Sequence, residues 1–461
     1  MRRALMLICG VILFTACDDG PKVHPDADGD VDAPDVVDVQ DADADMDVPD
    51  WPECTPWISE QNLPEGSLVE LPLPDPNGEG DLYPNSIFGN LMVLAQGYDL
   101  FLINLETFDA TSIVPSYSPF EFGFDRYVTY NKNIALKGNK CELVEQECVF
   151  FDMGIYIYYV SSGEWEYQID VPIVYSNEEL MSYIYVAKPE TEYVAYVLFD
   201  KFPESGGAGC SLFVNYLSTH EEHLVANKEQ YHTCGNSFLP SGPEVAFCGV
   251  NTQGTGLGLY LFNTEARTQV ELDTVPAGHC GVVSFLDENQ VLFETSRTIR
   301  GRYQGEIVEA VDYDVTSWNR QANALVPLSD DPWWSQLNLL SKPPLAVYRD
   351  HRVFCFGYPE AGVNASDAAY LVLHDLETGV KRPIPYPTSP MDSSHLHVTV
   401  PLGILETPWR LVFGDYGSYH DDPSFSVPAP PIFILNLELA GLVDEAGHVI
   451  PDPTYPPTPA N

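Results

Sequence analysis

The sequence predicts an all-β protein, more specifically a β-propeller of seven four-stranded blades that follows a disordered acidic tether. Three observations support this. No stretch in the core has the apolar period of a helix of eleven or more residues. Short runs that alternate apolar and polar residues recur along the chain. They recur about every 55 residues, the length that four strands and their turns need in one blade. Six or eight blades are the alternatives.

The recurring phrase is a strand followed by a polar turn and a second short strand. Its copies span residues 100–107, 155–163, 212–219, 259–265, 311–316, 370–379 and 432–438. Anchor residues of the seven copies are Asn104, Tyr159, Tyr216, Asn263, Asp314, Asp375 and Asn436. By residue number, the intervals between successive anchors are 55, 57, 47, 51, 61 and 61. Gly, Asn, Ser and Thr after these strands favour hairpin turns.

A second phrase reads as strand, tight turn and strand, and it occurs at 237–247 and again at 284–293. Both copies are similar to the F-S-P-D-G-x-x-I-A-F phrase of TolB-like and WD-like propeller repeats, in degenerate form. The resemblance covers repeats from 84 to 450. It implies a bladed architecture and no particular activity, because propellers with many functions share these repeats.

Ring closure can also be predicted. Residues 67–74 resemble the outer blade strands at 326–329 and 382–385, yet they precede the first blade. Pairing them with the last blade would close the ring and cover a strand edge. We therefore divide the folded part into a lead-in with the closing strand at 51–83, the propeller at 84–450 and a Pro-rich disordered tail at 451–461.

The N-terminus has the features of an export signal. Arg2 and Arg3 precede an apolar run at 4–14 that is too short to span a bilayer. Phe14-Thr15-Ala16-Cys17 resembles the bacterial lipobox, which implies that 1–16 is a signal peptide and Cys17 is lipidated. The resemblance places the protein in the bacterial cell envelope, facing the periplasm or on the cell surface. An ordinary signal peptide cut after Ala16 is the alternative.

Residues 17–50 form the predicted tether. From residue 18 onward it contains 13 Asp and one Lys, so it cannot bury enough apolar surface to fold. Within it, acidic residues on alternating positions resemble a calcium loop: Asp26, Asp28, Asp30, Asp32 and Asp35. No Glu closes the loop at the twelfth position, so a solvated spacer is favoured and calcium binding would be weak.

The net charge of −47 argues against nucleic-acid binding, because such a surface repels phosphate backbones. Residues 51–461 alone contain 18 basic and 55 acidic side chains. Self-repulsion of this size destabilises a compact fold unless salt screens it. We therefore expect the protein to work in salty water.

Eight cysteines follow Cys17, and an even number in an exported chain favours disulfides. Cys141 and Cys148 flank a short polar segment and are predicted to bridge a hairpin. Pairing of the others is open: Cys54, Cys210, Cys234, Cys248, Cys280 and Cys355. His232, Cys234, His279 and Cys280 precede equivalent strands and could together bind zinc. Disulfides with incidental histidines are the favoured interpretation, and no metal or other cofactor is predicted.

The remaining motifs are weaker indications of a metal, nucleotide or partner site. His395 and His397 lie on one strand face but lack a third ligand. Residues 220–223 lack the spacing of a helical zinc site, and the glycines at 254, 256 and 258 lack the helix that a nucleotide loop needs. Aromatic residues at 332–334 and 416–420 are candidate partner contacts, with core or rim packing as the alternative.

Two functions are consistent with this sequence. The first is a lipid-anchored binding or scaffolding module that presents a propeller face or channel to a protein, peptide or glycan. The second is an extracytoplasmic hydrolase or lyase that acts on a polymer through carboxylates at the mouth of the channel. No motif identifies catalytic residues, so the first is favoured. The sequence does not indicate an oligomeric state.

Overall fold

A computed structural model describes the fold, and strands are its sole regular elements in the described residues. These residues are 63–72, 74, 82–96, 99–113, 123–131, 133–144, 147–172, 175–176, 179–180, 182–190, 192–200, 209–231, 238–254, 256–275, 279–287, 289–303, 306–327, 336–350, 370–384, 399–415 and 431–452. In this part of the chain no helix is long and apolar enough to cross a membrane.

The strands form seven four-stranded antiparallel sheets, named here blades 1 to 7. Blade 1 contains β2 (Leu82–Phe88), β3 (Leu91–Gln96), β4 (Asp99–Asn104) and β5 (Ala110–Ser112). Blade 2 contains β6 (Gly123–Asn131), β7 (Asn133–Val144), β8 (Glu147–Tyr159) and β9 (Glu164–Pro172). A two-stranded hairpin of β10 (Tyr175–Ser176) and β11 (Glu179–Leu180) follows. Blade 3 contains β12 (Ser182–Pro189), β13 (Tyr193–Asp200), β14 (Gly209–Tyr216) and β15 (Glu221–Ala226).

Blade 4 contains β16 (Phe238–Ser241), β17 (Glu244–Val250), β18 (Leu257–Asn263) and β19 (Thr268–Val275). Blade 5 contains β20 (His279–Asp287), β21 (Gln290–Tyr303), β22 (Glu306–Asn319) and β23 (Ala324–Pro327). Blade 6 contains β24 (Gln336–Lys342), β25 (Leu345–Asp350), β26 (Tyr370–Asp375) and β27 (Lys381–Pro383). Blade 7 contains β28 (Thr399–Leu405), β29 (Arg410–Asp415), β30 (Ile432–Asn436) and, from the other end of the chain, β1 (Leu68–Glu70).

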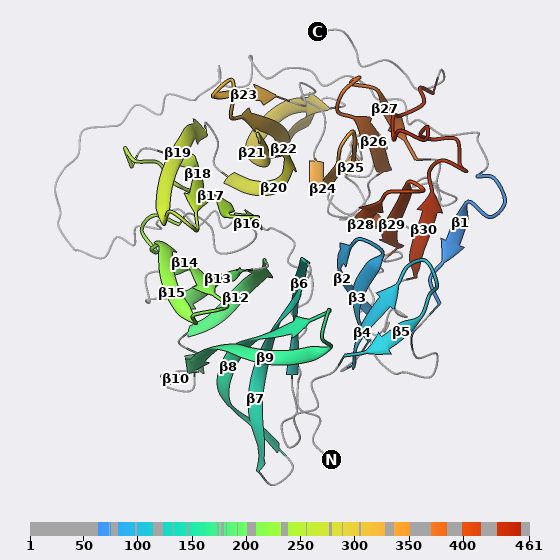
Figure 1. Ribbon diagram of the computed structural model, residues 1–461. Helices are drawn as coiled ribbons and strands as arrows, with labels where there is room; N and C mark the ends of the chain where they lie inside the picture. The colour runs from blue at the N-terminus through green and yellow to red at the C-terminus, as the bar shows by residue number, and fades with distance from the viewer. Residues whose placement is uncertain are drawn as a thin grey trace, which may run out of the picture. The chain divides into compact units, whose positions relative to one another are not determined.

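The blades form a closed ring in chain order (Figure 1). The first strand of each blade contacts the first strand of the next, from β2 through β6, β12, β16, β20, β24 and β28 back to β2. The chain is therefore a seven-bladed β-propeller, as predicted, and the alternatives of six and eight blades are excluded.

The predicted ring closure is confirmed by the pairing of β1 with β30. Leu68 lies opposite Leu435 and Glu70 opposite Phe433 in an antiparallel register. Figure 1 shows β1, from the start of the folded chain, beside β30 at its end. This pairing covers the edge that β30 would otherwise expose.

The core lies between the blades because strand residues alternate between the two faces of each sheet. In blade 6, Leu345 and Val347 of β25 belong to a cluster shared with Leu411 and Phe413 of blade 7. Ala346 and Tyr348, at the intervening positions, are fully buried on the opposite face, toward blade 5. The near-continuous apolar composition of such strands follows from burial on both faces.

Six of the seven anchor positions in the repeated phrase are the last residues of third strands: β4, β8, β14, β18, β26 and β30. The exception is Asp314, which lies within β22; that strand ends at Asn319. The prediction missed this end because β22 has 14 residues, about twice the length of most third strands. With Asn319 as the anchor, the interval from Asn263 and the interval to Asp375 become equal.

Candidate functional site

The two faces of the ring carry very different connections. In an antiparallel meander, successive connections alternate between the two ends of the sheet. Connections between first and second strands, and between third and fourth strands, have one to five residues. We call this side the short-turn face. The opposite side, the long-loop face, carries the segments 201–208, 351–369, 384–398 and 416–431, of which 351–369 is the longest.

Ion pairs reinforce the short-turn face. Among the described residues, each pair there joins two neighbouring blades: His220–Glu166, Arg267–Glu221, Arg320–Glu244, Lys342–Glu406 and Arg410–Glu106. Arg267 donates to both carboxylate oxygens of Glu221, at 2.7 and 2.6 Å, and its guanidinium lies 4.9 Å from the ring centre of Tyr216. The chain has only 21 basic residues, and several of them bridge blades on this face. We interpret the short-turn face as structural.

Longer loops tolerate variation and commonly carry binding residues on a rigid scaffold. The predicted aromatic contacts at 332–334 and 416–420, and His395 and His397, belong to connections of the long-loop face, but lie outside the described residues. Cys17, the tether and the Asp-rich calcium motif also lie outside them. Several of the contacts predicted from the sequence therefore belong to segments that the topology assigns to one face.

The described cysteines test part of the possible zinc site. Cys248 of β17 and Cys280 of β20 form a disulfide that joins blades 4 and 5. Cys210 is also disulfide-bonded. Because a bridged sulfur is no thiolate ligand, the proposed zinc site with Cys280 is wrong, and the favoured disulfide interpretation is confirmed for this residue. His232, Cys234, Cys54 and Cys355 lie outside the described residues.

The predicted bridge between Cys141 and Cys148 stays a prediction. The two residues lie on the paired strands β7 and β8, where Cys141 is opposite Phe150 and Cys148 is opposite Leu143. They are thus diagonal neighbours in the register. Within the described ranges, no three His, Cys, Asp or Glu side chains gather as a metal site would need.

Two weaker motifs have structural roles. His220 ends the turn between β14 and β15 with a positive φ of 54°, and His223 stacks on Phe262 of the next blade. Gly254 has a positive φ of 67° and donates its backbone N–H to the carbonyl of Asn251, in the β17–β18 connection. This segment is a hairpin connection, as predicted, and β18 follows it.

The best candidate for a functional side chain near the long-loop face is Glu294 of β21. It lies opposite Gly281 of β20, two positions from the His279–Ser296 pair at which β20 begins. Phe293 next to it packs against blade 4, so alternation directs Glu294 toward blade 6. The side chain is partly exposed, and burial raises its pKa to about 8.

The environment of Glu294 explains this shift. Its cross-strand neighbour on β22 is Val315, which is buried, and Leu292 on the same strand face is fully buried. Among the residues whose side chains are described, none donates a hydrogen bond to the carboxyl or pairs with it as a cation. Burial is the cause of the raised pKa, so the side chain is mostly protonated and neutral at pH 7. Strongly shifted groups of this kind are common at functional sites.

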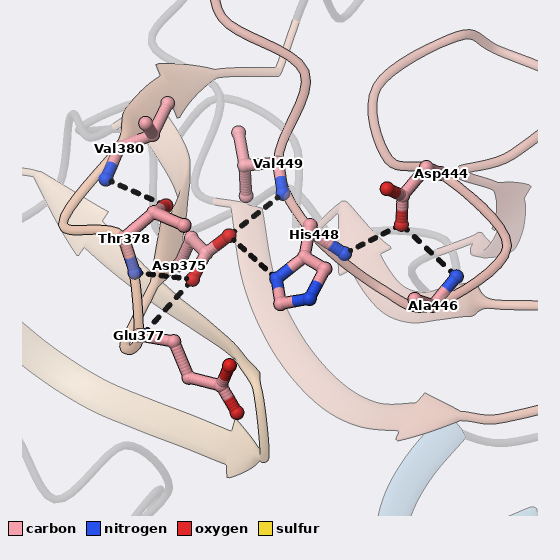
Figure 2. Close-up of polar contacts among 8 residues, drawn as sticks. All are labelled: Asp375, Glu377, Thr378, Val380, Asp444, Ala446, His448 and Val449. Carbon is pink, nitrogen blue, oxygen red and sulfur yellow. Dashed lines mark hydrogen bonds and ion pairs between the residues drawn. The ribbon is translucent and has the colours of Figure 1, made fainter.

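A second polar cluster surrounds Asp375, the last residue of β26, whose side chain is completely buried (Figure 2). Its Oδ1 accepts hydrogen bonds from the backbone N–H groups of Glu377 and Thr378, both at 2.9 Å. Its Oδ2 lies 3.1 Å from Nδ1 of His448 and accepts a bond from the N–H of Val449 at 3.2 Å. Burial opposes ionisation, but bonds from Thr378, Glu377 and His448 outweigh it and lower the pKa of Asp375.

This cluster holds the C-terminal segment 437–452, which we call the strap, against blade 6. Arg382 of β27 donates from Nη1 to the carbonyls of Gly441 and Ile450, at 2.8 and 2.9 Å. Leu442, Val443 and Val449 join the apolar cluster between blades 6 and 7. Among the described residues, no hydroxyl or thiol bonds to His448, so the pair lacks the nucleophile of a catalytic triad. We interpret it as a latch.

The sequence predicts Asp375 as an anchor of the repeated phrase but not its contacts with the strap. Asn104, Asn263, Asn319 and Asn436 occupy the equivalent positions in other blades and cap the following turns. These blades carry an amide at the position where blade 6 carries a carboxylate. This difference was the sequence signal that Asp375 has a second role. For Glu294 the sequence gives no such signal, because its environment comes from β20, β22 and the facing blade.

Several solved structures share the propeller fold with this chain at low sequence identity. No model of a protein family and no curated protein sequence matches the chain. An oligogalacturonate lyase in complex with manganese has 13% identity and a TM-score of 0.48, over 80% of this chain and 92% of that one. The β-propeller domain of the trilobed protease from Pyrococcus furiosus has 9% identity and a TM-score of 0.45, over 77% and 96%.

TolB from Acinetobacter baumannii has 11% identity and a TM-score of 0.33, over 76% of this chain and 78% of that one. The similar structures thus include a lyase, a peptidase-associated propeller and a TolB protein. With identities this low and TM-scores below 0.5, these similarities carry no argument about what this chain binds or catalyses.

Proposed function

We propose that this chain is a lipid-anchored cell-envelope propeller that binds a protein, peptide or glycan partner through its long-loop face. The contrast between the two faces carries the proposal. Short turns and inter-blade ion pairs occupy one face, whereas the other bears every connection longer than five residues between paired strands or successive blades. A rigid scaffold with long connections on one side is the usual arrangement of a binding module.

The direction of β1 supports this arrangement. The chain reaches β1 from residues 63–67, on the side of the short turns, because β1 takes the place of a fourth strand. The long connections thus lie on the face away from the entry of the chain into blade 7. For the anchor itself, Cys17→Ser should abolish incorporation of labelled fatty acid; retained label would contradict it.

The binding proposal is tested by exchanging connections. We would replace residues 351–369 and 416–431 with short Gly/Asn turns, and as a control replace the β18–β19 turn at 264–267 on the other face. Partners captured from envelope extracts with the full-length protein would be purified and their affinities measured. We expect the long-loop variants to lose at least tenfold in affinity and the control to stay within twofold. Equal effects, or no partner at all, would contradict the proposal.

The hydrolase or lyase remains the second candidate because Glu294 has a pKa suited to proton transfer near neutral pH. Polymer cleavage by acid–base chemistry generally uses a second group as well as the acid. Release of reducing or unsaturated ends from uronate polymers by the wild type, and its loss in Glu294→Gln, would favour the enzyme.

The calcium proposal for the tether concerns Asp26 to Asp35 alone. A peptide of residues 18–50 should become more compact when millimolar calcium is added, and unchanged dimensions would leave the tether as a spacer.

A further inference from the structure

We propose that the partner adds an acidic extended peptide segment, as a further strand, to the edge of a hairpin arm on the long-loop face. The arm is the outer part of the β21–β22 hairpin, residues 297–303 and 306–312. It extends on the long-loop face because its connection joins a second strand to a third. The inference rests on the proposed binding function and names the element that binds and the chemistry of the segment it takes.

The arm is a two-stranded ribbon at one end of blade 5. β20 pairs with β21 as far as Ser296, and β23 pairs with β22 as far as Thr316. β21 and β22 continue together for seven more pairs, of which the last joins Tyr303 to Glu306. Among the described strands, β22 is the only one that pairs with residues 297–303. A ribbon of two strands is marginally stable in water, and its edges can pair with a strand of another chain.

The backbone pattern shows which residues of β21 face the edge of the arm. The N–H of Arg320 donates to the carbonyl of Asn289, so these two form a hydrogen-bonded pair of the β21–β22 register. The register has no bulge, so hydrogen-bonded pairs recur at every second position, and the odd-numbered residues of β21 bond to β22. The backbone groups of Thr298, Arg300 and Arg302 are therefore directed away from β22, toward the side on which β20 lies lower in the blade. We call this side the β21 edge.

The β21 edge is basic in a chain that is strongly acidic. Residues 51–461 contain 18 basic and 55 acidic residues, and three of the basic ones lie here: Arg297, Arg300 and Arg302. Arg300 and Arg302 are two positions apart and therefore fall on one face of the arm. On β22 the acidic residues of the arm lie three positions apart, at 306, 309 and 312, so they alternate between the faces. Two like-charged residues in line on one face are thus a property of the β21 edge.

Charge complementarity specifies the segment that this edge accepts. A strand added beside β21 places every second residue on the face of Arg300 and Arg302. Acidic residues at two alternate positions of that strand would lie opposite these arginines. In the register Arg300 is also opposite Glu309 of β22, but a guanidinium has five N–H donors and can bond two carboxylates. Because a net charge of −47 repels acidic chains elsewhere, the β21 edge would fix where the segment binds.

The test uses the full-length protein and capped six-residue peptides of Val and Thr that carry Asp, Asn or Lys at the second and fourth positions. We expect the wild type to bind the Asp peptide about tenfold more tightly than the Asn peptide, since two exposed charge pairs each contribute a few-fold. The double variant Arg300→Gln/Arg302→Gln should lose this preference. The matched control Glu306→Gln/Glu309→Gln changes the other strand of the arm and should keep it. The double variant Arg300→Glu/Arg302→Glu should prefer the Lys peptide, a reversal that an unfolded arm would not produce.

Strand addition is tested with Asp peptides whose backbone nitrogens are methylated at alternate positions. One of the two sets should abolish binding and the other should not, because the N–H groups of a strand alternate between its two sides. Equal effects of both sets, no preference for the Asp peptide, or a preference that survives in Arg300→Gln/Arg302→Gln would overturn the inference. Tighter binding of the Lys peptide that depends on Glu306 and Glu309 would assign the site to the β22 edge instead.

The arm and the proposed function can fail separately. If exchange of the long connections abolishes capture of the envelope partner but Arg300→Gln/Arg302→Gln does not, the binding face stands and this inference fails. If the arginine variant loses the partner and the connection exchange does not, the arm binds the partner and the assignment to the long connections fails.

Discussion

Replacing Asp375 with Asn tests the latch between the strap and blade 6. The two side chains have the same shape, so Asn keeps the oxygen that caps the turn at Glu377 and Thr378. Its amide NH2 then faces the N–H of Val449, which is left unpaired in a buried position. Rotating the amide would only move the mismatch to the turn, because donors surround both oxygens of the native carboxylate.

The magnitude follows from these contacts. A buried N–H without a partner costs about 1–3 kcal/mol, and a hydrogen bond to a charged group contributes about 1.5–3 kcal/mol. Because the two terms overlap at Oδ2, we expect the free energy of unfolding to fall by roughly 2–3 kcal/mol. The folded-state pKa of Asp375 is lowered, so the difference should be complete well above pH 3.8 and shrink as the pH falls through the folded value.

Chemical denaturation at pH 7 and amide hydrogen exchange at Val449 measure the effect. Asn104→Asp is the matched control, since Asn104 caps its turn through the same two N–H positions and its side chain has no second role among the described contacts. We expect this control to change the free energy of unfolding by less than about 1 kcal/mol. The latch would be refuted by an Asp375→Asn variant whose free energy of unfolding lies within about 0.5 kcal/mol of the wild-type value, or by unchanged exchange at Val449.

Three further predictions concern stability. Replacing both Cys248 and Cys280 with Ala should lower the free energy of unfolding by about 3–4 kcal/mol, because their disulfide spans a sequence separation of 32 residues. Adding reductant should then lower the free energy of unfolding of the wild type more than that of the variant. The free energy of unfolding of Glu294→Gln should exceed that of the wild type by a difference that grows with pH between pH 5 and 8, by at most about 1.4 kcal/mol per pH unit. The reason is that ionisation of a group with a raised pKa opposes folding of the wild type. A difference that shrinks as the pH rises would contradict this prediction. Raising NaCl from about 0.1 to 1 M should stabilise the fold by screening self-repulsion, and a fall in melting temperature would show that the inter-blade ion pairs dominate instead.

Much of the fold could be predicted because each blade repeats a local pattern. The third strand and its capped turn recur with residues that identify them, as at Asn104 and Asn436. The closing strand could be predicted because an outer-strand phrase occurred before any blade that it could belong to. The end of β22 was missed because its length departs from the repeat.

The candidate site could be predicted only in part. Aromatic and histidine residues in the loops are visible in sequence, and topology assigns several of them to one face. Glu294 could not be identified, because nothing beside it in sequence tells whether a glycine lies opposite or whether a cation is near. The chain has 68 acidic residues. Glu294 differs from the others through its neighbours on β20 and β22 and through its burial between blades.

The central claim is that the long-loop face binds the partner. The most direct measurement is amide hydrogen exchange of the full-length protein with and without the captured partner. We predict protection at the ends of strands next to the long loops, including β20 near His279 and β21 beyond Glu294, with no change in the turns at 217–220, 264–267 and 320–323. Protection confined to those short turns would contradict the account.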